Sequence, residues 1–346
     1  FIYEENLKKN KHYELKRIMD FVGSDKKQTK LQTRAGAKNY FPTKRFKITV
    51  DSAKVVEEGV VRPEDRDKIV DEIKWKISGN GVMKNRMLQL DFIANNNWER
   101  PVYFAITTGS QAYAGLEDYF QLEGLAYRLV PIKDRDNDGM TGRVATDIMY
   151  DNLMNKFEWG NMGKKGVFLD ETNRRMTMNF RSNFGRLANA LIDEGKEEKA
   201  EEVCDKCLEV IPDFKIPYDY FVIPVAEAYY KIDETEKADK VMQRLLEIYN
   251  NDLAYYFNLK PEHRNAVSRE IDMGMTVLNQ LVQLSKQYNR EDLRKEAEES
   301  FDKYYQMYVQ FKQAGRSPQQ QRRIQQQRRQ QQQQQQSQGR QKQGQQ

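Results

Sequence analysis

Cysteine and histidine are scarce in this chain of 346 residues, each occurring only twice. The cysteines, Cys204 and Cys207, are too few for a disulfide framework, and no second pair completes a zinc site. Neither His12 nor His263 is framed by a serine or cysteine nucleophile motif. The sequence therefore predicts no disulfide scaffold, no structural zinc site and no histidine-based catalysis.

Long apolar runs are also absent. No stretch reaches the ~18 apolar residues of a membrane span, and no signal-peptide pattern is present. The mean hydropathy of −0.90 fits a soluble body with a polar tail. The chain begins at Phe1 rather than Met, so we expect it to be a piece of a longer or processed protein.

The net charge of +5 is concentrated near the C-terminus. Seven basic residues and no acidic ones follow Lys312, which leaves a net −2 for residues 1–312. A nucleic-acid interface needs a basic face, and no basic block with interleaved aromatics is evident in the body. We expect no nucleic-acid partner. Salt-sensitive binding of nucleic acid by the basic tail is the last-ranked alternative.

Residues 313–346 are rich in glutamine with paired arginines, and Ile324 is the one large apolar residue after Gly315. Such a composition cannot bury enough apolar surface to fold. We therefore predict a disordered Gln/Arg-rich tail at residues 313–346.

The N-terminal half alternates strand-like and helix-like patterns, which is typical of a mixed α/β domain. Residues 1–22 predict a helix and residues 24–39 a polar, basic loop. Strands are expected at residues 46–50, 73–77, 102–107 and 125–131, a short strand or loop at 55–61, and helices at 87–94 and within 115–124. We assign residues 1–171 to this α/β domain, without a strand order.

From about Thr172 the pattern becomes helical and repeats. Ala200, Ala238 and Ala297 each anchor a set of residues at the core offsets of tetratricopeptide repeats. The sets include Phe184, Leu187, Ala188, Leu191, Cys204 and Cys207; Val222, Val225, Ala226, Tyr229, Met242 and Leu245; and Leu281, Leu284, Tyr288, Phe301 and Tyr304. The spacing departs from the ~34-residue repeat. We predict a tetratricopeptide-like domain at residues 172–312.

The stretch at residues 94–105 connects an expected helix to an expected strand and carries the candidate binding residues. Asparagine tolerates the left-handed conformation that ends helices, and Pro101 favours extended geometry before the strand. The candidates for contact with a sugar or peptide are Asn95, Asn96, Asn97, Trp98, Arg100 and Tyr103. Alternatively, the asparagines cap backbone groups while Trp98 packs in the core, and this structural role is favoured.

Two further motifs have structural explanations. Residues 134–139 begin like a calcium loop, but Ala145 stands where the loop requires a bidentate glutamate. Cys204 and Cys207 have redox spacing, yet they fall at core offsets within a helix, so packing is the predicted role. We predict no metal site, no cofactor and no catalytic residue in this chain.

Five stretches carry a resemblance to a known family. They are KLQTR at 30–34, NNNWERPVYFA at 95–105, FQLEGLAYRLVP at 120–131, TDIMYDNL at 146–153 and RMTMNFR at 175–181. They resemble the C-terminal soluble region of bacterial multipass membrane proteins similar to protein O-mannosyltransferases. The resemblance covers most of residues 1–312; the Gln/Arg tail lies outside the family pattern.

The resemblance implies a parent protein with an N-terminal membrane part that uses a lipid-linked sugar donor. The catalytic acid is expected in a loop of that membrane part, so the enzymatic status of the parent is not settled by this chain. The soluble part is expected on the periplasmic face of the inner membrane, anchored through the missing transmembrane region. It would position an acceptor protein or partner through its tetratricopeptide-like repeats. The alternative is a non-enzymatic scaffold for protein–protein interaction.

Overall fold

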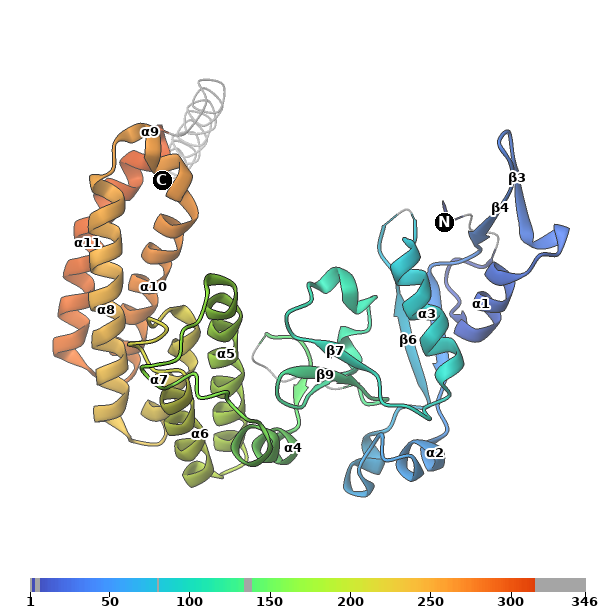
Figure 1. Ribbon diagram of the computed structural model, residues 1–346, viewed down its shortest axis with the longest axis horizontal. Coiled ribbons are helices and arrows are strands. Elements are labelled where there is room, and N and C mark those ends of the chain that lie inside the picture. Colours follow the sequence, from blue (N-terminus) through green and yellow to red (C-terminus); the bar gives the residue numbers. More distant parts are fainter. Residues whose placement is uncertain (1, 4–6, 80, 134–138, 315–346) are drawn as a thin grey trace, which may run out of the picture. The chain divides into compact units, whose positions relative to one another are not determined.

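A computed structural model describes residues 2–3, 7–79, 81–133 and 139–314, and these form two compact units (Figure 1). The first unit comprises residues 1–217 and the second residues 218–346. Because helices α5 (Glu171–Asp193) and α6 (Glu197–Val210) belong to the first unit, this division falls later in the chain than the expected start of the helical region. Compactness alone does not define a functional domain, so the predicted domain boundaries remain a prediction.

Three small sheets form the scaffold of the first unit. Their strand orders are β1 (Ile2–Tyr3), β4 (Gly36–Phe41), β3 (Lys30–Thr33); β2 (Tyr13–Glu14), β5 (Arg45–Thr49), β6 (Glu72–Lys76); and β10 (Arg143–Val144), β8 (Phe120–Leu122), β9 (Ala126–Leu129), β7 (Tyr103–Ala105). Each sheet contains one parallel pair, and the remaining pairs are antiparallel. The predicted mixed α/β class is confirmed.

Helices alternate with these strands. They are α1 (Leu15–Gly23), α2 (Ser52–Glu57), α3 (Lys84–Asn96), α4 (Thr146–Asp151), α5 (Glu171–Asp193) and α6 (Glu197–Val210). Short helical turns lie at Lys27–Thr29, Pro63–Lys68, Ser110–Tyr113, Glu117–Tyr119 and Asn152–Lys156. The predicted helix at residues 87–94 and the four predicted strands are confirmed in kind, with shifted ends.

Four local predictions were wrong. Within residues 115–124, where a short helix and then a turn were expected, a helical turn at Glu117–Tyr119 leads directly into strand β8. The helix expected over residues 1–22 begins only at Leu15, because Tyr13 and Glu14 pair in parallel with β5. The loop expected at residues 24–39 contains most of the β3–β4 hairpin. None of these residues is buried, so they lack a clear apolar alternation; the buried Tyr40 and Phe41 follow at the end of β4. Residues 55–61 begin in a helix, α2, because the Asp51 carboxylate accepts hydrogen bonds from the backbone amides of Ala53 and Lys54.

An aromatic cluster fills the core beside the third sheet. Phe120 is fully buried and lies 4.7 Å from Phe104, 5.2 Å from Tyr113 and 5.5 Å from Tyr127, measured between ring centroids. The Tyr119 hydroxyl accepts a hydrogen bond of 3.0 Å from the amide of Lys74 on β6. The bond connects the second and third sheets, and the cluster packs β7, β8 and β9 together, so the position of the segments around β7 is fixed.

The second unit is helical. It contains α7 (Ile223–Lys231), α8 (Thr235–Asn258), α9 (Pro261–Arg264), α10 (Ser268–Gln287) and α11 (Glu291–Ala314), with helical turns at Tyr220–Val222 and Asn265–Val267. Helix α7 packs on α8, and α10 packs on both α8 and α11. Ala238 and Ala297 are completely buried, as is Ala200 in the first unit. The predicted small-residue anchors therefore lie in the core, while membership of the tetratricopeptide family stays a prediction.

The predicted tail lies outside the described residues. Helix α11 continues to Ala314, two residues past the expected boundary. The predictions made for residues 315–346 stay predictions, as does the interpretation of residues 134–138 in the calcium-like motif.

Candidate functional site

The turn after α3 is built as a left-handed helix end. Asn97 adopts φ 47° and ψ 30°, and Trp98 follows with φ 65°. The side-chain amide of Asn96 donates to the carbonyl of Arg100 at 2.7 Å, and Asn95 donates to the carbonyl of Asp91 at 2.8 Å. The prediction that these asparagines end the helix is confirmed.

Trp98 connects this turn to the core. Its side chain is half-buried and packs against a cluster of Val55, Val60, Val61, Val130 and Ile132. A large residue at positive φ is strained, and the packing of the indole offsets that strain. Trp98 therefore has a clear structural role, in agreement with the favoured interpretation of the turn.

A hollow of about 370 Å³ opens beside the same turn. One wall consists of Asn95, Asn96, Asn97 and Trp98, together with Ile93 and Ala94. The facing wall comes from distant segments and includes Glu14, Leu15, Lys16, Ile48 and Thr49. Within that wall the Thr49 hydroxyl donates to the Glu14 carboxylate at 2.5 Å, and Lys47 lies 3.2 Å from the same group.

This hollow combines an aromatic ring, amides, a hydroxyl and one charge of each sign. Small-molecule sites have such linings, with apolar area and a few polar groups, and its volume lies at their lower limit. The Asn95 and Asn96 side-chain amide nitrogens are engaged within the turn. Their amide oxygens accept no hydrogen bond from the described residues and are therefore the groups suited to receive a hydroxyl or amide donor.

Arg100 and Tyr103 do not line that hollow. Arg100 is exposed and borders a second hollow of about 350 Å³, together with Leu88, Phe92 and Glu99. Tyr103 is 48% exposed on β7, and its hydroxyl donates to the Glu123 carboxylate at 2.8 Å. Burial raises the pKa of Tyr103, and the hydrogen-bonded Glu123 carboxylate raises it further. The six candidate residues thus occupy three neighbouring environments.

Glu123 belongs to a buried polar network that the sequence analysis missed. Gln121 donates to Glu123 at 2.7 Å and accepts a hydrogen bond from Arg143. Arg143 also lies 3.4 Å from Asp65. The Asp65 carboxylate accepts a hydrogen bond of 2.8 Å from the Lys68 ammonium group. Burial raises the pKa of the Asp65 carboxyl, but the Lys68 hydrogen bond and the Arg143 and Arg62 charges lower it overall. Asp65 and Arg143 are 78 residues apart, so no local pattern reveals the pair.

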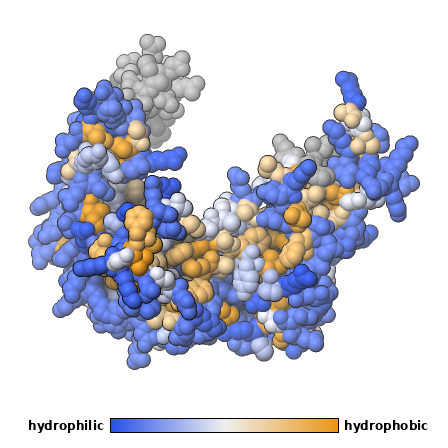
Figure 2. All heavy atoms as spheres, viewed as in Figure 1, coloured by the Kyte–Doolittle hydropathy of each residue, from blue (hydrophilic) through white to orange (hydrophobic). Residues whose placement is uncertain are grey.

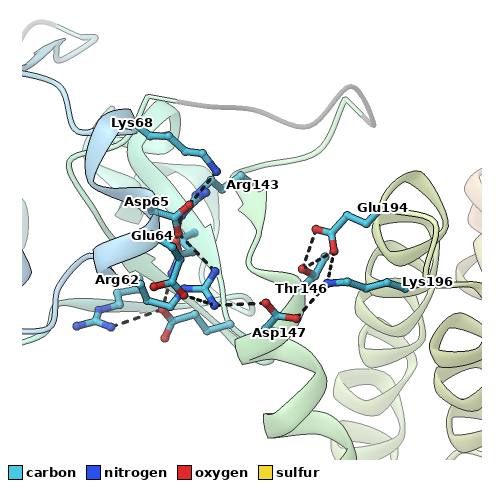
Figure 3. A network of polar contacts seen from close by, with 12 residues as sticks. Arg62, Glu64, Asp65, Lys68, Arg143, Thr146, Asp147, Glu194 and Lys196 are labelled. Atoms are coloured by element: carbon cyan, nitrogen blue, oxygen red, sulfur yellow. Dashed lines mark hydrogen bonds and ion pairs between the residues drawn. The ribbon is translucent and has the colours of Figure 1, made fainter.

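A second set of charges continues from this network toward α5 and α6 within the first unit (Figure 3). Asp147 lies 3.4 Å from Arg62 and 3.1 Å from Lys196. Glu194 lies 2.7 Å from Lys196 and accepts a hydrogen bond of 2.8 Å from Thr146. Every charge in this set has an opposite partner, so the arrangement holds elements together and shows no excess charge for a ligand.

The remaining motifs have structural positions. Cys204 and Cys207 are completely buried in α6 and form no disulfide, which confirms the predicted packing role. His263 is exposed, whereas His12 is half-buried and precedes α1 instead of lying in a helix. Within the described ranges, no group of three or more His, Cys, Asp or Glu side chains is placed to hold a metal ion.

Comparison with known families gives one match. Residues 1–148 match a family model described as TMEM260-associated domain 2, which covers less than half of the chain. No curated protein and no solved structure matches. The first 148 residues are thus similar to a domain family linked to a membrane protein. None of the helices in the described part of the chain is long and apolar enough to cross a bilayer.

Proposed function

We propose that this chain is the extramembrane accessory region of a membrane-embedded protein O-glycosyltransferase that uses a lipid-linked sugar donor. The observation that carries the proposal is the match of residues 1–148 to a domain associated with a membrane protein. The resemblance of five stretches to the C-terminal region of protein O-mannosyltransferase-like proteins supports the same class. The parent would hold this region at the periplasmic face of the inner membrane through a transmembrane part N-terminal to it.

In this proposal the helical hairpins bind the protein ligand. Helices α7 and α8 pack together, as do α10 and α11, and small residues such as Ala226, Ala238 and Ala297 are buried in them. Packed helix pairs of this kind, when repeated, form surfaces that suit extended peptides. The ligand is an acceptor protein or a partner of the transferase. The α/β part would then hold these helices near the membrane-embedded catalytic centre.

The hollow beside Trp98 is assigned a lesser role, as a contact for a sugar or a peptide segment of the acceptor. Ligand-observed NMR with a panel of monosaccharides and acceptor-derived peptides would test it. Asn95→Ala removes one lining amide, and the exposed Asn155→Ala serves as a matched control. Signals that weaken only with Asn95→Ala would support the contact, and identical signals for both variants would contradict it.

Removal of the parent gene tests the proposed class of activity. Glycoprotein staining of the periplasmic fraction should lose bands when the parent is absent and regain them when the full-length parent is restored. An unchanged pattern would overturn the glycosyltransferase proposal.

The alternative is a non-enzymatic tetratricopeptide scaffold. It is favoured by the same helical hairpins, since these alone are sufficient for partner binding. It predicts that a stable partner is recovered with the full chain while glycosylation is unchanged in cells that lack the parent. Both results together would replace the first proposal.

A further inference from the structure

Residues 1–312 are nearly neutral as a whole, but their charges are unevenly distributed along the chain. Residues 1–50 contain 13 basic and five acidic side chains, a net +8. Residues 51–312 therefore carry −10, since residues 1–312 together carry −2. The asymmetry is sharpest between Asp25 and Asp51, where eight basic residues occur without an acidic one: Lys26, Lys27, Lys30, Arg34, Lys38, Lys44, Arg45 and Lys47.

Four of these basic side chains are engaged or sheltered. Lys30 lies 3.3 Å from Asp25, Lys47 is paired with Glu14 and Glu72, and Lys44 donates to a backbone carbonyl at 2.7 Å. Arg45 is half-buried. The other four, which we call the hairpin cations, are exposed and have no ion-pair partner among the described residues: Lys26, Lys27, Arg34 and Lys38.

Lys26 and Lys27 lie at the helical turn that leads into β3, and Arg34 and Lys38 lie on the β3–β4 hairpin itself. A two-residue turn joins its strands, with Thr33 opposite Gly36, and the Thr33 hydroxyl donates to the Gly36 carbonyl at 2.7 Å. Asn39 donates to the carbonyl of Val22 at the end of α1, also at 2.7 Å. The hairpin extends beyond α1, and the surface at its tip is hydrophilic (Figures 1 and 2).

Only the C-terminal end of this hairpin contributes to the core, where Tyr40 and Phe41 of β4 are buried. None of residues 24–39 is buried, and a two-stranded hairpin is marginally stable by itself. Its attachment to α1 and β1 maintains an exposed strand pair whose main distinctive property is positive charge. That combination suits contact with an extended anionic surface.

We propose that the hairpin cations bind the anionic phospholipid headgroups of a membrane. Basic side chains next to an anionic bilayer each strengthen binding, and the attraction acts within a Debye length. The net −10 of residues 51–312 is repelled by the same surface, so the hairpin is the end that approaches it. Residues 26–39 contain no aromatic side chain for stacking on bases, which favours lipid over single-stranded nucleic acid. The match to a membrane-protein family agrees with this partner.

Vesicle flotation of the full 346-residue chain tests the proposal. The vesicles contain phosphatidylcholine alone or with about 30 mol% phosphatidylserine. The hairpin variant replaces Lys26, Lys27, Arg34 and Lys38 with Gln. The matched tail variant replaces Arg322, Arg323, Arg328 and Arg329 with Gln and lowers the net charge by the same amount. Circular dichroism of each variant verifies that folding is retained.

The full chain should float with the anionic vesicles, and raised salt should release it. The hairpin variant should bind at least about tenfold more weakly, and the tail variant should bind nearly as well as the unmodified chain. Equal weakening of both variants, or loss in the tail variant alone, would overturn the proposal. So would tighter binding to single-stranded RNA than to anionic vesicles. The proposal requires only a nearby membrane, so it can fail while the glycosyltransferase function holds, and the reverse is also possible.

Discussion

The two units of this chain are stabilised by different kinds of contact. Helix α8 in the second unit buries eight side chains, and all of them are apolar or tyrosine. The first unit buries more charged groups, among them Asp65, Glu123, Arg143 and Arg181, whereas Asp219 is the charged side chain found buried among the described residues of the second unit. Apolar helix packing depends on periodicity along the chain, whereas each buried charge needs a specific partner from a distant segment. The comparison implies that the first unit is the more sensitive to the loss of a single polar side chain.

Arg181→Leu should give the largest effect. Its guanidinium is completely buried and donates to the carbonyls of Ile211, Ile216 and Pro217 after α6. Loss of these donors should lower the free energy of unfolding by about 3–5 kcal/mol. All three tryptophans lie in the first unit, so tryptophan fluorescence during urea unfolding reports it selectively.

Arg175→Leu on the same helix provides the control for Arg181→Leu. Arg175 is exposed and pairs with Glu171, so its replacement should change stability by less than about 0.5 kcal/mol. Equal effects of the two substitutions would show that the buried hydrogen bonds of Arg181 are not decisive.

Leu245→Ala should have the next largest effect and should act on the second unit. Leu245 is completely buried in α8, so the cavity should cost about 2–5 kcal/mol. Far-UV circular dichroism should show an earlier helical transition, while the tryptophan transition moves much less. Met307→Ala, at an exposed position of α11, should leave both transitions in place. A full shift of the tryptophan transition would instead show that the units unfold as one.

Asn97→Val should have a smaller effect, within the turn of the candidate site. A β-branched residue at φ 47° is strained, and we expect a loss of about 1–2 kcal/mol. Asn97→Gly should be nearly neutral, because glycine adopts positive φ freely. Urea midpoints from tryptophan fluorescence compare the two variants, and a larger loss for glycine would contradict the left-handed turn.

The smallest effect should be a pH-dependent one at Glu72. Hydrogen bonds from Lys47 and Lys74 lower the pKa of this carboxyl to about 2. Its folded-state pKa lies below the unfolded value of ~4.3, so its contribution is complete above that pH and is lost as pH falls toward 2. Glu72→Gln should therefore lower the urea midpoint at pH 6 but make little difference near pH 2. A constant difference at both pH values would contradict the ion pairs.

The sequence predicted the elements that depend on local apolar patterns, and it missed those that lack such a pattern or depend on contacts between distant segments. The long helices from α5 onward and the buried alanine anchors were predictable, because their apolar pattern is local. The β3–β4 hairpin was missed because its residues 30–39 bury no side chain and only Tyr40 and Phe41, at the end of β4, reach the core. For the candidate site, the left-handed end at Asn97 was predictable from residue type. The facing wall with Glu14 and Thr49 was not, since only tertiary structure brings those segments together.

We propose that this region supports glycosylation by a membrane-embedded transferase. The most direct measurement is the occupancy of glycosylation sites in periplasmic proteins, determined by mass spectrometry. Cells without the parent gene are complemented with either the full-length parent or a version lacking residues 218–314, which form a separate compact unit. At equal amounts of parent protein in the membrane, we predict lower occupancy without these residues. Equal occupancy in the two strains would contradict the account.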